Sequence, residues 1–233
     1  MATLRTEGRP AKLFVVIAAF NEELAIAQTV RQVRQYVDDV VVVDDHSTDA
    51  TSEIALQSGA HVVRHPLNLG QGAALQTGID YALAQSADYI VTFDADGQHA
   101  ANEIPGMYRA LVESGAEVAL GSRFLGRANN LSRSRRILLK VAIAFTHLTT
   151  GVGFSDVHNG FRIISRGFAE KFHFLQNRMA HASEILAYIA HKKVPYIEFP
   201  VTVAYTDYSV GKGQRNSNSI RILMELILGK ISK

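Results

Sequence analysis

The sequence has no cysteine and little proline, with 5 prolines among 233 residues. A chain without cysteine has no disulfides, no thiolate zinc site and no thiol nucleophile, which fits a reducing compartment. An excess of one charge is also lacking, because 24 basic and 22 acidic residues leave a formal net charge of +2. So small a charge does not indicate a nucleic-acid partner.

Long apolar runs are absent as well. No segment reaches the roughly 20 apolar residues that span a bilayer. The polar stretch at residues 1–12 lacks the apolar core of a signal peptide. We therefore expect a cytoplasmic chain that is neither secreted nor inserted across a membrane.

The composition that remains is ordinary for a globular protein, with 47% hydrophobic and 20% charged residues. Along the first two-thirds, apolar runs rich in β-branched residues alternate with amphipathic stretches. The expected strands are residues 13–19, 40–43, 61–64, 89–93 and 118–120. The expected helices are residues 22–36, a segment capped by Ser47 or Thr48, and residues 73–84. This alternation predicts an α/β fold with a mainly parallel central sheet flanked by helices.

The last third of the chain is less regular. It is expected to hold helices at residues 136–148 and 181–191 and strands at residues 161–164 and 196–205. No linker rich in proline, glycine or serine marks a boundary, so residues 1–233 are predicted to form a single domain.

Polar clusters follow each of the first four expected strands. They are residues 21–23, 44–47, 68–72 and 94–99. In an open parallel sheet the carboxyl ends of the strands form one rim, and ligands bind there at the topological switch point. Four clusters on one rim therefore predict a binding site.

Asp94 and Asp96 are the sharpest feature of these clusters. Two residues apart on an extended chain, their carboxylates face the same side and repel each other. A divalent cation relieves that repulsion, and oxygen ligands suit Mg²⁺ or Mn²⁺. Gln98 offers a further neutral oxygen. A substrate diphosphate would complete the coordination, so two protein carboxylates suffice.

The other rim clusters are open to two interpretations. In the first, Asp45 or Ser47 caps the following helix. In the second, the aspartate that is not used as a cap accepts hydrogen bonds from a base or a ribose. Gly70 and Gly72 lack both the third glycine of a dinucleotide fingerprint and a Walker lysine, so they indicate only close backbone approach at a helix start.

Two features outside the rim suggest a surface partner. Five arginines between residues 123 and 136 precede an apolar helix, and they form either a solvated face or an edge that lies against an anionic membrane. Residues 220–231 form a helix with a broad apolar face, which is expected to be buried, packed on a second subunit or laid in a membrane interface. Among the nine histidines, His99, beside the acidic pair, and His181, near Glu184, are the candidates for a role in the site.

Several stretches resemble family 2 glycosyltransferases with the GT-A fold, in particular dolichol- and polyprenyl-phosphate hexose synthases and transferases that build cell-surface polysaccharide. The matching stretches are VVIAAFNEE (15–23), VVVDDHSTDAT (41–51), NLGQGAALQTGI (68–79), FDADGQHAANEIP (93–105), GSRF (121–124) and DVHNGFRIISR (156–166). They run in the expected order through most of the chain.

The resemblance implies inverting transfer of a hexose from a GDP- or UDP-hexose donor. It places Mg²⁺ or Mn²⁺ on Asp94, Asp96 and Gln98. It assigns residues 12–125 to the nucleotide-sugar half and residues 126–233 to the acceptor half. The residues implied to bind the donor are Ala18, Phe20, Glu22, Asp44, Asp45, Asn68, Gly70, Gly72, Asp94, Ala95, Asp96, Arg123 and Lys212.

The acceptor implied by the resemblance is a lipid phosphate or a lipid-linked glycan in cell-envelope glycan synthesis. Ala18 and Phe20 depart from the common Pro and Tyr of the synthases, and Lys212 matches only loosely the lysine of their later segment. The implied catalytic residues are Asp156, Glu184 and Arg162. A sugar hydroxyl would need Asp156 or Glu184 as a base, whereas a lipid phosphate is already anionic.

Two other classes of protein share part of this sequence pattern. A receiver domain also carries an acidic pair after a buried strand, but it begins on that strand, whereas here residues 13–19 precede it. A catalytically inactive relative that binds nucleotide sugars or acts as a scaffold is the main alternative. The intact Asp94 and Asp96 argue against it, and metal-dependent hydrolysis of the donor would distinguish the two.

Overall fold

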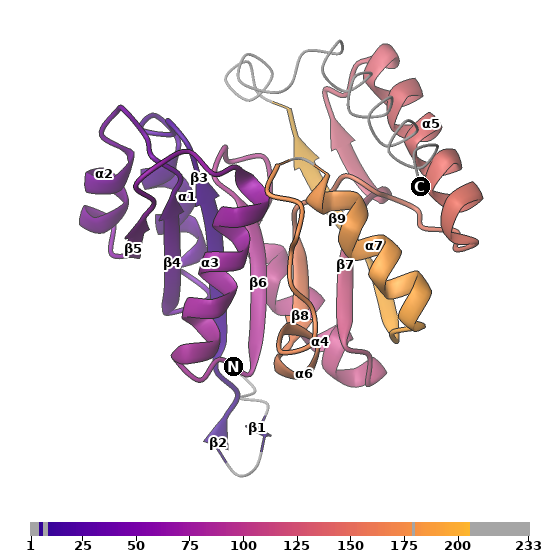
Figure 1. The fold of residues 1–233 in the computed structure, drawn as a ribbon, viewed down its shortest axis with the longest axis horizontal. Coiled ribbons are helices and arrows are strands. Elements are labelled where there is room, and N and C mark those ends of the chain that lie inside the picture. The colour runs from indigo at the N-terminus through magenta and orange to yellow at the C-terminus, as the bar shows by residue number, and fades with distance from the viewer. Residues whose placement is uncertain (1–4, 7–8, 179, 206–233) are drawn as a thin grey trace.

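The computed structural model describes residues 5–6, 9–178 and 180–205 (Figure 1). Its main sheet has the strand order β5-β4-β3-β6-β8-β7-β9. The strands are β3 (Leu13–Ala19), β4 (Asp39–Asp44), β5 (His61–Arg64), β6 (Tyr89–Asp94), β7 (Val118–Asn129), β8 (Arg162–Ser165) and β9 (Tyr196–Ala204). A short antiparallel hairpin of β1 (Arg5–Thr6) and β2 (Arg9–Pro10) stands apart from this sheet.

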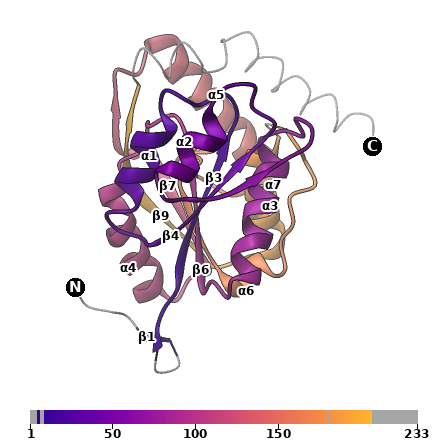
Figure 2. The ribbon, with the colours of Figure 1, turned by 90° about the vertical axis from the view of Figure 1, so that its left-hand side faces the viewer.

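Helices cover both faces of the sheet (Figure 2). One face packs against α1 (Ile26–Val33), α2 (Thr51–Gln57) and α4 (Ile104–Ser114), the last preceded by the 3₁₀ turn η1 (Ala101–Glu103). The other face packs against α3 (Gln71–Ala84), α5 (Arg133–Thr150), α6 (Arg166–Ala169) and α7 (His181–Lys192). Among the described residues, no helix has both the length and the apolar character needed to cross a membrane.

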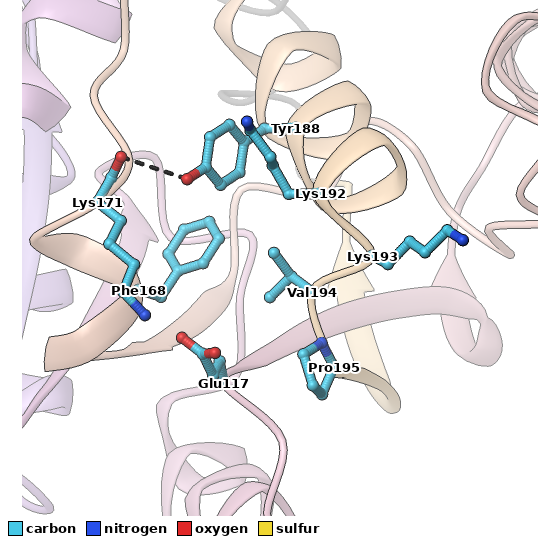
Figure 3. Close-up of a pocket in the computed structure, with 8 residues that line it drawn as sticks. All are labelled: Glu117, Phe168, Lys171, Tyr188, Lys192, Lys193, Val194 and Pro195. Atoms are coloured by element: carbon cyan, nitrogen blue, oxygen red, sulfur yellow. Dashed lines mark hydrogen bonds between the residues drawn. The ribbon is translucent and has the colours of Figure 1, made fainter.

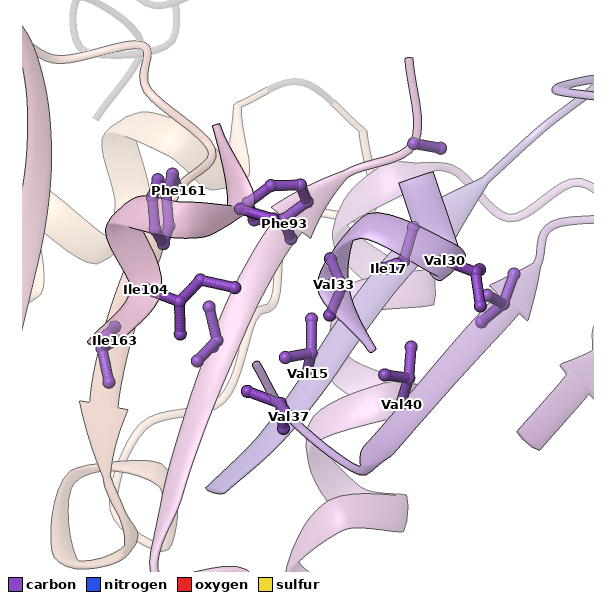
Figure 4. Packing of buried hydrophobic residues seen from close by; sticks show 14 of the residues in the cluster. Val15, Ile17, Val30, Val33, Val37, Val40, Phe93, Ile104, Phe161 and Ile163 are labelled. Carbon is purple, nitrogen blue, oxygen red and sulfur yellow. The ribbon is translucent and has the colours of Figure 1, made fainter. Parts of the chain in front are cut away.

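The sheet is mainly parallel, as predicted. β3 pairs in parallel with β4 and β6, and β4 pairs in parallel with β5. β8 alone runs antiparallel, between β6 and β7. β3 is buried on both faces because odd and even residues of its apolar run enter different cores. Val15 and Ile17 pack with Val30 of α1 and Phe93 of β6 (Figure 4).

Several element boundaries differ from the predictions, three of them for reasons that the contacts show. α2 begins at Thr51, since Ser47 instead accepts a hydrogen bond from the Asn21 amide at 2.8 Å. α1 is shorter than the predicted helix over residues 22–36. β7 is longer than predicted because it follows β9 through a register shift between Ser122 and Arg127. The predicted helix over residues 220–231 lies outside the described residues.

The topology gathers distant segments at one rim. The chain leaves β3 for β4 and β5 on one side, and later returns to β6 on the other side. The switch point therefore lies at the carboxyl ends of β3, β4 and β6. Because β8 is antiparallel, its first residue, Arg162, lies opposite Thr92 of β6 and Leu120 of β7. The segment before β8 thus joins the same rim.

Candidate active site

Asp94 is held in place by three separate parts of the chain. Its Oδ2 lies 2.8 Å from His99 Nε2, and its Oδ1 accepts a hydrogen bond from Gln71 Nε2 at 3.3 Å. A Cβ at Gly160 would lie 2.4 Å from Asp94 Oδ1, so glycine permits this close packing. The Asp94 side chain remains 31% exposed. The carboxylate is therefore fixed in direction and still open to a ligand.

Asp96 lies beside Asp94, half-buried, and its Oδ1 accepts a hydrogen bond from the Gln98 amide at 3.1 Å. Burial, together with the charge of Asp94, raises the pKa of Asp96 to about 6. Burial alone would raise the pKa of Asp94 too, but the hydrogen bond from His99 and the charges of His99, Arg162 and His181 together lower that pKa. The environment thus favours the anionic form of Asp94, whereas the negative charge of Asp94 disfavours the anionic form of Asp96.

This pair fits a hard divalent cation. It offers carboxylate oxygens at an accessible rim, which is the donor chemistry that Mg²⁺ and Mn²⁺ prefer. Among the described residues, no group of three or more His, Cys, Asp or Glu side chains could hold a metal ion. A cation at Asp94 and Asp96 would therefore need ligands from a substrate as well, with Gln98 the predicted source of a further protein oxygen.

Asp45 anchors the loop of residues 68–72. Its carboxylate accepts hydrogen bonds from the Leu69 and Gly70 amides at 2.8 and 2.7 Å, and His65 Nδ1 lies 2.8 Å from its Oδ1. Only 3% of Asp45 is exposed. The neighbouring strand end thus holds the loop through a buried carboxylate. That Asp44 or Asp45 contacts the base or the ribose of a nucleotide stays a prediction.

Asp44 is equally enclosed and shapes the turn into α2. It accepts hydrogen bonds from the Ser47 amide at 2.8 Å and from the Ser52 hydroxyl, and Arg64 Nε lies 3.6 Å from its Oδ2. These contacts join the end of β4 to the residues that follow it. The predicted cap by Asp45 or Ser47 is wrong, because α2 follows Ala50 and has no side-chain cap hydrogen bond.

The two glycines of the 68–72 loop meet another part of the chain. A Cβ at Gly70 would lie 2.3 Å from Asn177 O, and one at Gly72 would lie 2.1 Å from Gln176 O. The Gly72 amide also donates to Asn177 O at 2.9 Å. The close backbone approach that the glycines predict is therefore made by residues 176–177.

Glu184 of α7 holds this overlying segment. Its carboxylate accepts hydrogen bonds from the Leu175 and Gln176 amides, each at 3.0 Å. The structure thus places a predicted catalytic carboxylate where it anchors a loop.

Asp156 and Arg123 form a buried ion pair. Asp156 Oδ2 lies 2.6 Å from Arg123 Nε, and the guanidinium also donates to His158 O at 2.6 Å and to the Tyr205 hydroxyl at 2.5 Å. Arg123 is 7% exposed and Asp156 is 3% exposed. In this arrangement Asp156 is a partner of Arg123 rather than a free base.

The remaining predicted residues are spread along the rim. Ala18 is the penultimate residue of β3, and Ala95 directly follows β6. Phe20 directly follows β3 and is 44% exposed. Ala95 contributes its carbonyl to a hydrogen bond from Thr29 Oγ1 at 2.9 Å. The others are Glu22, half-buried; Asn68, exposed; Arg162, buried at the start of β8; and Lys212, outside the described residues.

Sequence reasoning placed the 68–72 loop at the site without giving Gln71 a role of its own, and it missed Gly160. Both lie inside stretches that match the family, but neither residue type signals a role near a carboxylate. His99 was singled out for its place after Asp96, and the structure pairs it with Asp94.

A separate pocket lies away from this rim (Figure 3). It is lined by residues near the amino ends of β7 and β9, including Glu117 and Pro195, and by side chains of α6 and α7 such as Phe168 and Tyr188. Parallel strands start at the opposite edge of the sheet from the rim, so this pocket contains none of the predicted site residues.

Comparison with known sequences shows the family of the chain. The profile of glycosyl transferase family 2 matches residues 14–172. An uncharacterized protein of Methanocaldococcus jannaschii is 35% identical, covering 94% of this chain and 93% of its own length. The UDP-N-acetylglucosamine–dolichyl-phosphate N-acetylglucosaminyltransferase of Methanococcus voltae is 26% identical, covering 95% and 97%. The polyprenol monophosphomannose synthase of Mycolicibacterium smegmatis is 30% identical, covering 96% and 87%.

Solved structures share the fold. Glucosyl-3-phosphoglycerate synthase from Mycobacterium tuberculosis, in complex with Mn²⁺, UDP and phosphoglyceric acid, aligns with a TM-score of 0.69 at 20% identity. The alignment covers 92% of this chain and 78% of the synthase. This likeness confirms the predicted GT-A fold class.

Proposed function

Because the chain belongs to glycosyl transferase family 2, we propose that it moves a hexose, with inversion, from a GDP- or UDP-hexose to a lipid-phosphate or lipid-linked glycan acceptor in cell-envelope glycan synthesis. The observation that carries the proposal is the Asp94 carboxylate, held by His99 and Gln71 beside Asp96 at the switch point of the sheet. Ligands of open α/β sheets bind at this place.

The donor side of the site supports metal dependence. A Mg²⁺ or Mn²⁺ ion held by Asp94 and Asp96, with Gln98, would neutralise the diphosphate leaving group as charge builds on it. The chain's own contribution is orientation, since His99 and Gln71 fix the direction of Asp94 before any ligand arrives.

The acceptor side favours a lipid phosphate over a sugar hydroxyl. A hydroxyl must lose a proton to a base as it attacks. The two candidate bases are already engaged, Asp156 with Arg123 and Glu184 with the Leu175 and Gln176 amides. A phosphate monoester is anionic at neutral pH and needs no base. The names of the Methanococcus voltae and Mycolicibacterium smegmatis relatives support the same acceptor class.

Peripheral contact with the inner face of the plasma membrane is part of the proposal. The exposed face of α5 carries Ile137, Val141 and Leu148, which are 63%, 46% and 84% exposed. Exposed basic residues Arg133 and Arg136 flank them, and α5 contains no acidic residue. Apolar area and positive charge together favour an anionic bilayer surface. The competing occupant of this surface is a second copy of the chain.

The test of function starts with the donor. A thermal-shift screen of nucleotide sugars with Mn²⁺ should identify the donor, because a bound ligand raises the melting temperature. Transfer of the labelled sugar to undecaprenyl phosphate is then measured for the wild type and for Asp94→Ala and Asp96→Ala. Both variants should lose transfer while keeping a cooperative thermal transition, and Asp80→Ala, exposed on α3, should keep activity.

Removal of the metal gives an independent check. EDTA should stop transfer and added Mn²⁺ should restore it, since the carboxylate pair offers too few ligands to hold an ion tightly. Full activity of Asp96→Ala, or undiminished turnover in EDTA, would rule out the metal role. Absence of transfer and of donor hydrolysis with every nucleotide sugar would favour an inactive relative.

A further inference from the structure

Arg162 is a buried cation at the rim that has no direct partner in the described part of the chain. Only 3% of the residue is exposed. Its guanidinium makes no hydrogen bond to a described residue, and no described carboxylate lies within 4.0 Å of its nitrogens. Arg123, also buried, donates to Asp156, His158 and Tyr205. A buried charge without a partner is costly, so its retention calls for an explanation.

Arg162 and Asp94 project from the same face of the sheet. Arg162 lies opposite Thr92 in the β6–β8 pairing, and Asp94 follows two residues later on β6. Side chains of paired residues, and of residues two apart on a strand, share a face. Burial lowers the pKa of Arg162 to about 10 against the attraction of Asp94 and Asp156. The guanidinium of Arg162 therefore remains a cation at neutral pH and lies close enough to Asp94 to be attracted by its carboxylate.

The side-chain nitrogens of Arg162 are not fully enclosed. Among the described residues, the fully enclosed side-chain nitrogens and oxygens that lack a partner belong to His99, Tyr108, His158 and Asn159. The guanidinium nitrogens of Arg162 are not among them, although they have no partner either. They are therefore not fully enclosed, and the small exposed part of this 3%-exposed residue leaves them in reach of a ligand.

We propose that Arg162 binds the phosphate of the acceptor. This rests on the proposed function, in which the acceptor is a lipid phosphate. A guanidinium presents parallel N–H donors that match phosphate oxygens. The acceptor is favoured over the donor by the strand order, since β8 lies across β6 from β3 and β4. The strand ends of β3 and β4 carry residues assigned to the nucleotide.

In the transfer, Arg162 holds the acceptor phosphate against the anomeric carbon. One phosphate oxygen forms the bond to that carbon while the bond from the carbon to the donor diphosphate breaks with its electron pair. No proton moves in this step. Neutralising part of the charge on the acceptor lowers its repulsion from the diphosphate as the two anions approach.

The test compares Arg162→Gln with Arg166→Gln. Arg166 lies four residues later at the start of α6, half-buried, where it pairs with Glu170 and donates to Ala87 O, so it controls for loss of one structural arginine. Calorimetric titration with farnesyl phosphate should show binding weakened by about tenfold or more in Arg162→Gln, as expected for a lost guanidinium–phosphate contact. Binding of UDP and GDP with Mn²⁺ should stay within about twofold of wild type, and Arg166→Gln should change neither.

Further probes separate the sources of the phosphate. Farnesyl phosphate should bind the wild type more tightly than inorganic phosphate, and farnesol should not bind. Equal affinity for inorganic phosphate would overturn a lipid source. Unchanged affinity of Arg162→Gln for farnesyl phosphate, or a loss confined to nucleoside diphosphates, would overturn the assignment to the acceptor.

A second variant covers the case in which Arg162→Gln does not fold. Arg162→Lys keeps the charge and loses the planar fork, so its affinity for farnesyl phosphate should still fall severalfold, and an unchanged affinity would count against the proposal. These binding measurements do not depend on turnover. Failure of transfer with every nucleotide sugar would refute the proposed function and leave the role of Arg162 to be decided by the titrations.

Discussion

The aspartates at the end of β4 show how one residue type takes different tasks at neighbouring positions. Asp45 reaches across to the 68–72 loop, whereas Asp44 turns back to Ser47 and Ser52 of its own segment. Both are buried, and both accept several hydrogen bonds. Their effects on binding and on stability should therefore separate.

We predict that Asp45→Asn weakens donor binding, because the 68–72 loop loses charge-assisted hydrogen bonds from Leu69 and Gly70. The expected loss is on the order of 1–3 kcal/mol. Asp44→Asn should lower the free energy of unfolding and leave donor affinity unchanged. Calorimetry and chemical denaturation of both variants measure these effects. Unchanged donor affinity in Asp45→Asn would contradict a role for this loop in the donor site.

His181 provides a pH-dependent prediction. Burial, with the charge of Arg162, lowers its pKa from 6.5 to about 4. Below pH 6.5 the unfolded chain therefore gains a proton at this site before the folded chain does, so stability falls as the pH drops toward 4. The slope for one such proton is about 1.4 kcal/mol per pH unit.

The measurement is urea denaturation of wild type and His181→Gln between pH 7 and pH 4.5. Other groups titrate alike in both proteins, so the difference between the two curves isolates His181. Wild type should lose stability faster than His181→Gln as the pH falls. Parallel curves would show that His181 is accessible to protons in the folded state.

At the scale of elements, the loop at residues 176–177 covers the start of α3, which lies in the other half of the chain. The segment at residues 176–177 lies on the first turn of α3, against Gly70 and Gly72. Glu184, on the first turn of α7, holds the same segment by its backbone amides. Through this loop, α3 and α7 are positioned relative to Asp94.

We predict that Glu184→Gln loses less than about tenfold in kcat, because an amide oxygen still accepts hydrogen bonds from the loop. A general base replaced by glutamine would lose about 10²–10⁴-fold. Glu184→Ala should lower stability further than Glu184→Gln does. A kcat for Glu184→Gln reduced a hundredfold or more, with normal stability, would restore Glu184 as the base and favour a hydroxyl acceptor.

At the scale of the whole molecule, the exposed face of α5 is an apolar surface that a binding partner would cover. Ile137, Val141 and Leu148 project from one side of the helix with basic residues beside them. The face belongs to the half of the chain that is assigned to the acceptor. A lipid acceptor would bring a membrane to this side.

We predict that anionic liposomes sediment the protein at low salt and release it at high salt. Each basic residue near anionic lipid contributes roughly 1 kcal/mol, so a double variant with glutamate at positions 133 and 136 should bind much more weakly. A double variant with Arg31→Glu and Arg109→Glu, exposed on α1 and α4, controls for the same change in net charge. Deletion of residues 219–233 tests the predicted C-terminal helix separately.

Protein that stays in the supernatant with anionic vesicles at low salt would refute the membrane contact. A soluble or protein-bound acceptor would then be the better hypothesis. Dimerisation that is insensitive to salt and is lost on Ile137→Glu would assign the α5 face to a second copy of the chain.

The sequence by itself determined the strands, the α/β class, the family and the acidic pair at the end of β6. These features depend on neighbours along the chain. The apolar run of β3 has to be buried on both faces, and Asp94 and Asp96 share a side because they are two residues apart on extended backbone.

Only the tertiary structure decided what the polar side chains do. Asp45 bonds to amides 24 and 25 residues away, and Asp156 pairs with an arginine 33 residues away. The antiparallel course of β8 brings Arg162 beside Thr92, 70 positions earlier in the chain. Such partners are set by which strands become neighbours in the sheet. Local periodicity does not encode the order of the strands, so aspartates that look alike in the sequence, such as Asp45 and Asp156, take different partners in the fold.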